Sequence, residues 1–481
     1  MKHEVGKLAP TVAVVGGGLA GLAAGTALAS AGFKVTLLER KPFLGGRASS
    51  YELPGADEVV DNCQHVVLGC CTNLIDFYRR IGASDLVRWY DHLTFIEPGG
   101  RQSVISPSWL PAPFHAARSF LRAPMLAGPD KRAIARALAA FASRLPADDG
   151  RPFSQWLLDR GQSAGAIEHF WKPVLVSSLN EDLERISLPA AALVFRESFM
   201  KSAQGGRMGL PRVPLSDLYS RAGEYIRANG GTIEMRAAVE QVEPFQEKVL
   251  FAPRLYARVS VNNVSQMFDY AVSALPFDQL MRILPDVPEL QGLRTQLGRF
   301  ETTPITGIHI WFDRQITKLD HAVLLDRTIQ WMFHKSRILG THRQDGSEGT
   351  NGSYVELVVS ASKSLVDLSR KEIIEMAIQE LVEFFPAVWE ARPLKATVVK
   401  EINATFAPLP GVDANRPPAQ TPWPRVFLAG DWTATGWPAT MESAVRSGYL
   451  AAEAICRTEG THQRFLVPDL PPSGFMRLLG N

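Results

Sequence analysis

A cluster of glycines near the N-terminus restricts the fold more than any other feature of the chain. Gly16, Gly18 and Gly21 stand between TVAVV, an apolar run that predicts a buried strand, and LAGLAAGTALAS, which predicts a helix. Glycines at this spacing permit a tight turn, close approach of the backbone to a pyrophosphate, and close packing of helix on strand. The pattern therefore predicts a dinucleotide-binding unit, in which the helix N-terminus at Leu19 and Ala20 offers N–H groups to the ligand.

An acidic residue ends the next predicted strand, FKVTLLE, at Glu39, and Arg40 follows it. A carboxylate at this point accepts hydrogen bonds from ribose hydroxyls and disfavours a 2′-phosphate. Together with the turn, it favours dinucleotide binding over a glycine turn that serves packing alone. These features do not separate FAD from NAD.

The region from Leu8 to Phe33 carries no charge, which is long enough to raise the question of a signal peptide or a transmembrane helix. Its glycines and the β-branched stretch from Val12 to Val15 instead indicate a strand, a turn and a small-residue helix. Since no other long uncharged apolar run is present, we expect that the chain does not span a membrane.

The composition is that of a large globular protein. The chain has 481 residues, of which 46% are hydrophobic and 21% charged, so its length favours two domains. The net charge of +2 provides no overall field to attract nucleic acid, and we expect no such partner. The four cysteines lack CxxC spacing, which predicts free thiols in a cytosolic protein and no protein-bound metal. They are Cys63, Cys70, Cys71 and Cys456.

Segments at both ends of the chain favour FAD. Gly45, Gly46 and Arg47 form a second glycine turn soon after the first, where an arginine can hold the other side of a diphosphate. Gly430 and Asp431 close a late predicted strand, where a carboxylate can bind ribityl hydroxyls. Taken singly, each piece is also compatible with a surface turn.

The last predicted helix begins at Met441, and its N-terminus can place N–H groups at the electron-rich edge of a flavin. Val239, in the predicted strand-turn-strand segment 232–245, completes the set of cofactor-binding candidates.

Other segments predict the remaining architecture. Alternating patterns at 305–312, 329–335 and 353–360 predict an antiparallel sheet. We expect an FAD-binding domain from 1–100, 205–290 and 415–460, a substrate domain from 101–204 and 291–414, and a C-terminal tail, 461–481.

The motifs GGGLAG, LLERKPFLGGR and FLAGDWTATGWPATMESAVRSGYLAA resemble the FAD-dependent amine oxidase and carotenoid desaturase superfamily. The resemblance extends over essentially the whole chain, and only the FAD motifs are highly specific. It implies an α/β fold similar to amine oxidases and phytoene desaturases, with a Rossmann-type FAD-binding domain and an inserted mixed α+β substrate domain. Some amine oxidases attach their flavin in the segment that corresponds to Pro424 to Ser447; because no cysteine lies there, we expect noncovalent FAD.

Within that superfamily, DNCQHVVLGC, the stretch from Trp171 to Pro173 and GWPATMESA resemble the hydroxysqualene dehydroxylases. This resemblance implies reductive removal of the hydroxyl of hydroxysqualene to give squalene, a hopanoid precursor. Cys63 stands where that branch usually has glycine, so its side chain is expected to crowd the flavin if the backbone must approach it there.

The same segment supplies candidate catalytic residues, His65, Gln64 and Asp61. Loss of hydroxide from an allylic carbon needs a proton donor, and a histidine that titrates near neutrality meets that need. Asp61 is a candidate to orient the imidazole. The alternatives are a structural histidine beneath the flavin and an aspartate that caps a turn.

Aromatic residues in the middle of the chain are candidates to line a tunnel for a long isoprenoid, which binds by burying apolar area. We expect only two or three of them to touch ligand, because most such rings belong to the core. They are Trp171, Phe195, Phe199, Trp311, Trp331, Phe333 and Tyr354.

The segment 109–145 combines apolar residues, including Trp109 and Phe114, with an excess of arginine and lysine. It predicts peripheral contact with an anionic membrane surface, on the inner face of the cell membrane in a cytoplasmic protein. The alternative is a helical lid whose arginines are solvated.

Two other functions remain open. A carotenoid or phytoene-type desaturase or isomerase would use the same FAD site for oxidation, whereas a prenyl-lipid carrier would do no redox chemistry. The intact flavin motifs argue against the carrier. The reductant is left open by the sequence.

Overall fold

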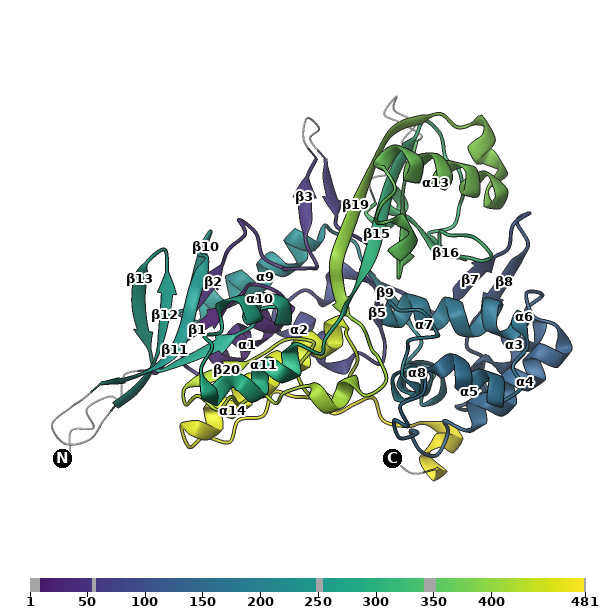
Figure 1. Cartoon of the computed structure of the whole chain (residues 1–481). Coiled ribbons are helices and arrows are strands. Elements are labelled where there is room, and N and C mark those ends of the chain that lie inside the picture. The colour runs from purple at the N-terminus through teal and green to yellow at the C-terminus, as the bar shows by residue number, and fades with distance from the viewer. Residues whose placement is uncertain (1–8, 54–57, 248–253, 341–351, 480–481) are drawn as a thin grey trace.

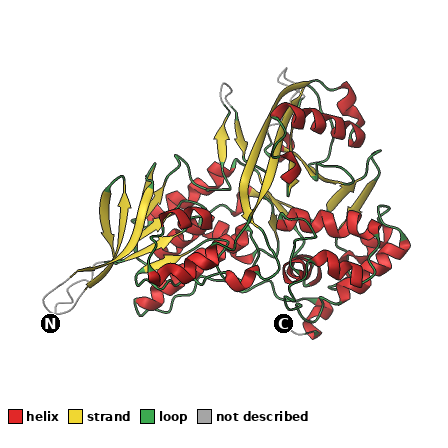
Figure 2. Ribbon diagram, viewed as in Figure 1, coloured by secondary structure: helices red, strands yellow, loops and turns green. Residues whose placement is uncertain are grey.

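The computed structural model describes residues 9–53, 58–247, 254–340 and 352–479, and places them in two adjoining regions (Figures 1 and 2). Residues 1–8 and 480–481, the outer ends of the predicted first and last segments, lie outside the described residues. Long strands rise from the region that holds the glycine motif into the second region.

A five-stranded parallel sheet forms the centre of the first region, and its edge strands come from late in the chain. Its strands, in spatial order, are β10 (Thr232–Met235), β2 (Lys34–Glu39), β1 (Thr11–Val15), β14 (Tyr270–Ser273) and β20 (Val426–Leu428). A parallel sheet is covered on both faces, which explains why β1 and β14 are almost continuously apolar.

Three helices cover one face of this sheet: α1 (Leu19–Ser30), α9 (Leu215–Ala228) and α14 (Met441–Thr458). Helix α1 is rich in small residues and packs closely on α14, where a Cβ on Gly448 would lie 2.3 Å from the carbonyl oxygen of Ala20. The antiparallel sheet of β11 (Val239–Glu247), β12 (Arg254–Val261) and β13 (Val264–Phe268) packs against the other face.

The second region contains a seven-stranded sheet that includes the three predicted antiparallel strands. Its order is β19 (Pro393–Phe406), β15 (Thr302–Phe312), β18 (Ser353–Ser360), β17 (Trp331–His334), β16 (His321–Leu324), β7 (Leu93–Ile96) and β8 (Gln102–Ile105). Helix α13 (Arg370–Phe384) packs on this sheet.

Strand β7 lies inside the segment 1–100 that was predicted for the FAD-binding domain, yet it belongs to this second sheet. Phe95 and Ile96 pair in parallel with Val323 and Leu324 of β16, which gives their apolar side chains a place in the core clusters of the second region. The first segment of the FAD-binding region therefore ends before residue 100.

A helical lobe lies beside the seven-stranded sheet around Trp171. Its helices are α3 (Ala117–Arg122), α4 (Gly128–Ala139), α5 (Phe153–Asp159), α7 (Lys172–Leu179) and α8 (Leu188–Phe195). The C-terminal tail does not stand apart: Phe465 packs in the core of the first region, and Met476, in the short helix η9 (Gly474–Leu478), packs in the lobe.

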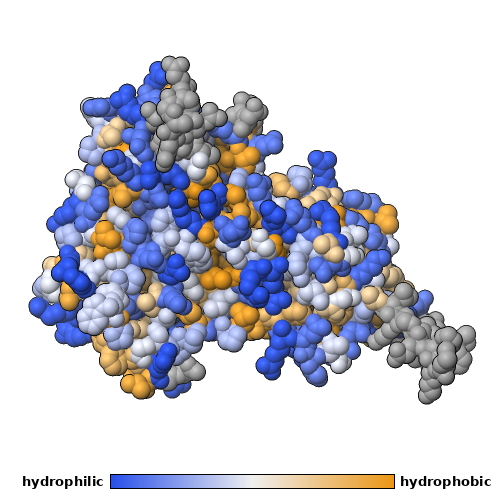
Figure 3. Space-filling model, turned by 180° about the vertical axis from the view of Figure 1, so that it is seen from behind, coloured by the Kyte–Doolittle hydropathy of each residue, from blue (hydrophilic) through white to orange (hydrophobic). Residues whose placement is uncertain are grey.

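Smaller elements join the regions: α2 (Thr72–Arg80), the pair β3 (Ser50–Glu52) and β4 (Val59–Asp61), and the sheet of β5 (Val67–Leu68), β9 (Met208–Pro211) and β6 (Val87–Tyr90). Viewed from behind, hydrophobic side chains form a band between the two regions (Figure 3). Among the described residues, no helix combines the length and apolar character needed to cross a bilayer.

Candidate active site

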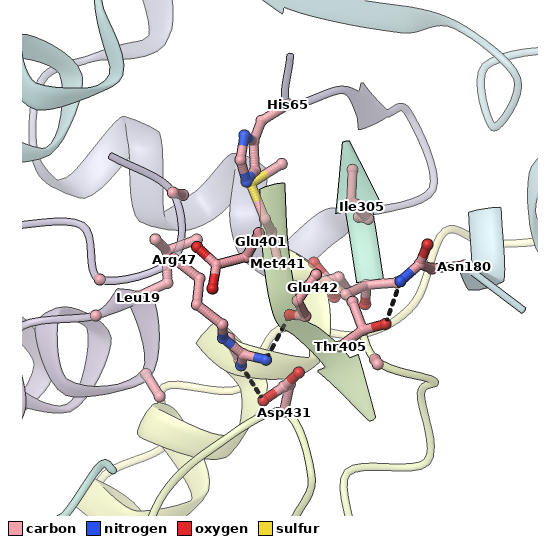
Figure 4. Close-up of a pocket in the computed structure, with 18 of the residues that line it drawn as sticks. Leu19, Arg47, His65, Asn180, Ile305, Glu401, Thr405, Asp431, Met441 and Glu442 are labelled. Atoms are coloured by element: carbon pink, nitrogen blue, oxygen red, sulfur yellow. Dashed lines mark hydrogen bonds and ion pairs between the residues drawn. The ribbon is translucent and has the colours of Figure 1, made fainter. Parts of the chain in front are cut away.

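One cavity of about 780 Å³ extends from the glycine turn after β1 into the space between the seven-stranded sheet and the helical lobe. Figure 4 shows part of its lining. Most of the predicted site residues line it, although they come from segments far apart in the sequence. They are Gly16, Gly18, Leu19, Ala20, Glu39, Arg40, Gly45, Gly46, Arg47, Gln64, His65, Val239, Gly430, Asp431 and Met441. Gly21 and Asp61 are not among the lining residues.

The first glycine turn has the shape that a bound diphosphate requires. A Cβ on Gly21 would lie 1.9 Å from the carbonyl oxygen of Gly16, so this glycine allows α1 to pack on the turn rather than touching ligand. Gly18 faces open space, since a Cβ there would meet only the Cα of Gly46, at 3.8 Å. No side chain caps α1, which leaves its N-terminus available to an anion.

The second glycine turn lies directly against the first. The Gly45 N–H donates to the carbonyl oxygen of Gly17 at 2.8 Å, and Lys41 Nζ donates to the carbonyl oxygen of Gly46 at 3.3 Å. The Glu39 carboxylate is held beside both turns, where it accepts from the backbone N–H groups of Gly17 at 2.6 Å and Lys41 at 2.7 Å. Its position at the cavity fits the predicted contact with ribose.

An ion pair joins the two ends of the chain across the cavity. Arg47 donates to Asp431 Oδ1 at 2.5 Å and to the carbonyl oxygen of Ala404 at 2.8 Å (Figure 4). The N-terminus of α14 also reaches the cavity at Met441, where the Thr440 hydroxyl accepts from the Ser443 N–H at 3.1 Å. An open glycine cradle, two helix N-termini, the Glu39 carboxylate beside the cradle and the Asp431 carboxylate form a donor and acceptor set that fits FAD.

His65 lines the cavity, and its tautomer follows from its contacts. Nδ1 lies 2.8 Å from the carbonyl oxygen of Cys63; because a carbonyl oxygen only accepts, Nδ1 carries hydrogen. Nε2 is therefore the nitrogen that gains or loses a proton. Burial lowers the pKa of His65 below its ordinary value, which favours the neutral form of the ring.

Asp61 does not orient His65, and the predicted pairing is wrong. Asp61 Oδ1 accepts from the Ser50 hydroxyl at 2.7 Å and from the Leu215 N–H at 3.1 Å, and Oδ2 pairs with Lys335 Nζ at 2.8 Å. Both oxygens are therefore occupied by groups outside the cavity wall. The imidazole is oriented instead by the backbone of Cys63.

Lys335 forms a buried charged cluster beneath the loop that carries His65. Its ammonium donates to Asp61 and, at 2.9 Å, to Gln64 Oε1, and it lies 3.5 Å from Glu356 Oε2. Gln64 in turn donates to the carbonyl oxygen of His65 at 3.0 Å. Although burial lowers the pKa of Lys335, Asp61 and Glu356 together raise it above its ordinary value, so Lys335 stays charged.

Glu356 is expected to make stability depend on pH in a specific direction. Burial raises its pKa from 4.5 to about 7, despite the opposing effect of Lys335. The folded state therefore keeps this proton after the unfolded state has lost it, and stability falls as pH rises from 4.5 through 7, by an amount on the order of 3 kcal/mol.

Glu356→Gln removes the titrating group. As pH rises across that interval, the free energy of unfolding of the variant should therefore increase relative to that of the wild type. Urea denaturation at pH 5 and pH 8 measures the difference. If the variant and the wild type differed in free energy of unfolding by the same amount at pH 5 and at pH 8, the assigned protonation of Glu356 would be contradicted.

Cys63 is buried at the cavity wall, with its sulfur 3.9 Å from His65 Nδ1. Burial raises the pKa of its thiol, which keeps the sulfur uncharged. All four cysteines are free thiols, and the structure places all four in buried positions.

The inner part of the cavity is mainly apolar. Three of the seven predicted aromatic residues line it: Phe199, Trp331 and Phe333. Trp171 and Phe195 are fully buried in the lobe behind the wall, and Trp311 stacks on Tyr354 with ring centroids 4.2 Å apart. The cavity thus joins a polar cradle to an apolar chamber.

Comparison with known proteins agrees with this geometry. Residues 19–456 match the family model described as flavin containing amine oxidoreductase. A 15-cis-phytoene desaturase of an Oncidium hybrid cultivar is 27% identical over 463 residues, which cover 92% of this chain and 77% of the relative. The 15-cis-phytoene desaturase of Synechococcus elongatus is 26% identical over 471 residues, covering 94% and 97%.

Among solved structures, cyclohexylamine oxidase from Brevibacterium oxydans superposes with a TM-score of 0.66 at 16% identity, covering 94% of this chain and all of that one. This likeness supports the fold, an α/β FAD-binding domain with a mixed second region. The match of the family model over nearly the whole chain, on a site built for FAD, shows that the protein belongs to the flavin containing amine oxidoreductase family.

Proposed function

We propose that this FAD-dependent oxidoreductase acts on a long isoprenoid and removes the hydroxyl of hydroxysqualene to give squalene. The observation that carries the proposal is the single cavity in which the FAD cradle opens into an apolar chamber, with His65 in its wall. A thirty-carbon hydrocarbon offers few polar groups, so its binding must come from apolar contact with the chamber.

The reaction consumes two electrons and two protons. The allylic carbon–oxygen bond breaks, the carbon receives a hydride, and the oxygen receives a proton and leaves as water. FAD, when bound in this site in its reduced form, would supply the hydride, and an external two-electron donor would be needed to reduce it again. The chain must bind the hydrocarbon, exclude water and deliver the proton.

His65 Nε2 is the proposed proton donor, because Nδ1 is held by the Cys63 carbonyl. Lys335 donates to Gln64, and Gln64 donates to the carbonyl oxygen of His65. Lys335 does not line the cavity, so it positions the ring through Gln64, which does. An imidazolium with a lowered pKa is a stronger acid than ordinary histidine, although it is populated only at lower pH.

The proposal is tested with purified protein, reduced anaerobically with dithionite and incubated with hydroxysqualene. We expect squalene in stoichiometric yield with flavin reoxidation. Oxidised protein should not convert phytoene or amines under air. Flavin that stays reduced in the presence of hydroxysqualene, with no squalene formed, would refute the proposal.

The second candidate is a carotenoid desaturase. The similarity to 15-cis-phytoene desaturases over more than nine-tenths of the chain favours it. It predicts the opposite redox direction: oxidised protein would reduce its flavin when phytoene is added. A protein purified without flavin absorbance would instead support a lipid carrier.

His65→Ala is expected to abolish squalene formation and to leave the bound flavin in place, because the ring contacts the loop rather than the glycine cradle. The wild-type rate should increase as pH falls below 6.5, since the acidic form of His65 accumulates only there. His462→Ala, at an exposed position, is the control and should behave as wild type. A His65→Ala protein with full turnover would remove His65 from the mechanism.

A further inference from the structure

Two distant segments form one exposed apolar surface on the helical lobe, which we name the α3 surface. It comprises Trp109, Phe114, Arg118, Leu121, Arg122, Phe475 and Leu478. Trp109 is 84% exposed, Leu121 65% and Leu478 81%, values that are unusual for such large apolar side chains. Hydrophobic atoms gather at the corner of the molecule beside the C-terminal residues (Figure 3).

The two segments are fixed to one another. The Phe475 N–H donates to the carbonyl oxygen of Ala112 at 2.9 Å, and the rings of Phe114 and Phe475 meet edge to face with centroids 6.2 Å apart. Gly474 has φ +54°, and a Cβ there would lie 2.6 Å from the Ala112 nitrogen. Since Met476 is buried in the lobe, the apolar side chains around it are held outward by a fixed turn.

A groove of about 480 Å³ runs between β8 and α3 at the edge of this surface. Trp109, Arg118 and Arg122 line it, and the two arginines lie one turn apart on α3. Neither has a hydrogen-bond or ion-pair partner within the described part of the chain. The nearby acid Asp130 is engaged by Ser163 and by the N–H of Ala127.

Unpaired guanidinium groups beside exposed aromatic and aliphatic side chains match the chemistry of a phospholipid surface. Arginine binds phosphate through paired N–H groups, tryptophan favours the headgroup level, and leucine favours the acyl boundary. A protein partner would need acidic groups opposite the two arginines and apolar groups opposite the exposed aromatic and aliphatic side chains, all within a small area. The bilayer supplies both over any area.

We propose that the α3 surface docks on an anionic lipid bilayer, with Arg118 and Arg122 on headgroup phosphates and Trp109, Leu121 and Leu478 in the interface. The C-terminal segment is thus part of the docking site together with α3. The docking is independent of the substrate identity proposed above. Its use in supplying substrate rests on that proposed function.

A chain of aromatic contacts links helix α3 to the wall of the substrate chamber. Phe120 of α3 contacts Phe170, Phe170 stacks on Phe195, and Phe195 contacts Phe199, which lines the cavity. Strand β8, at the groove, pairs with β7, whose Phe95 also lines the cavity. A water-insoluble substrate dissolved in the bilayer would therefore be concentrated next to the chamber.

The test is co-sedimentation of the flavin-loaded protein with vesicles. We expect binding to vesicles of phosphatidylcholine with about 30 mol% phosphatidylglycerol, and at least about tenfold weaker binding to phosphatidylcholine alone, with loss at high salt. Arg118→Gln/Arg122→Gln and Trp109→Ser/Leu478→Ser should each weaken binding by about tenfold or more.

Matched controls are Trp389→Ser, at a tryptophan that is 81% exposed elsewhere, and Arg299→Gln/Arg464→Gln, at two exposed arginines outside the groove. Both should bind as wild type, and flavin content reports that each variant is folded. Absence of vesicle binding, or equal loss in the controls, would overturn the proposal. Binding of inorganic phosphate that requires Arg118 and Arg122, in a protein that does not bind vesicles, would also overturn it, because that result would identify a site for free phosphate.

Discussion

Gly46→Ala is expected to yield folded protein that has lost most of its FAD. Gly46 has φ +64°, and a Cβ there would lie 2.8 Å from the Cα of Gly18. The contact is with backbone, which cannot rotate away, so the two glycine turns must separate where Gly18 opens into the cavity. We expect at least about tenfold weaker FAD binding, equivalent to about 1.4 kcal/mol or more. The ratio of flavin to protein absorbance and a fluorescence titration measure it.

Gly82→Ala is the matched control. Gly82 has φ +68°, almost the same backbone conformation, but nothing lies within 4 Å of a Cβ at this position. Both substitutions carry the left-handed backbone cost of about 1 kcal/mol, so stability should fall to a similar extent. Only Gly46→Ala should lose flavin. Equal flavin content in the two variants would show that the contact between the turns does not shape the site.

Lys335→Met is expected to cause the largest loss of stability. Lys335 is 1% exposed, and the substitution leaves the carboxylates of Asp61 and Glu356 buried without their shared cation. Removing one partner of a buried ion pair costs about 3 to 5 kcal/mol, because the remaining charge is uncompensated. Gln64 also loses its donor, so turnover should fall in the protein that does fold.

Two comparisons make this result specific. Lys172→Met removes an exposed ion pair with Glu168 and should change the free energy of unfolding by at most about 0.5 kcal/mol. Adding Asp61→Asn to Lys335→Met removes one of the stranded charges and should restore part of the stability. Urea denaturation of the four proteins at pH 8 measures both effects. A Lys335→Met protein as stable as Lys172→Met would contradict the buried cluster.

The FAD half of the site could be predicted because its signals are local. Gly16 to Glu39 form one strand-turn-helix-strand unit, and each residue type there follows from what the backbone must do. The late segment at Asp431 could be assigned to the flavin from its carboxylate after a strand, but nothing local in the sequence shows that it lies beside Arg47. The ion pair between Arg47 and Asp431 now gives that link a physical cause.

The charged cluster could not be predicted, because its members are brought together by strand register. Glu356 of β18 pairs with Phe333 of β17, two residues before Lys335, and both lie far along the chain from Asp61. In the sequence, a single lysine directly after an apolar strand is typical of a solvent-exposed residue at the end of that strand. Only its burial beneath β4 shows its role, and for the same reason the partner predicted for Asp61 is wrong.

The placement of β7 had a similar cause. The sequence around Phe95 is typical of a strand, but the neighbouring residues do not indicate which sheet that strand joins. Its partner, β16, begins more than two hundred residues later, at His321.

The order of strands in the parallel sheet has a consequence for biosynthesis. Strand β14 ends at Ser273, whereas its neighbour β20 begins at Val426, so the nascent chain carries an open sheet edge for roughly 10 to 30 s of translation. Helix α14, which covers α1, leaves the ribosome later still. The complete cofactor site includes Asp431 and Met441, so it can form only when synthesis is nearly complete, and the edge of β14 stays open until then.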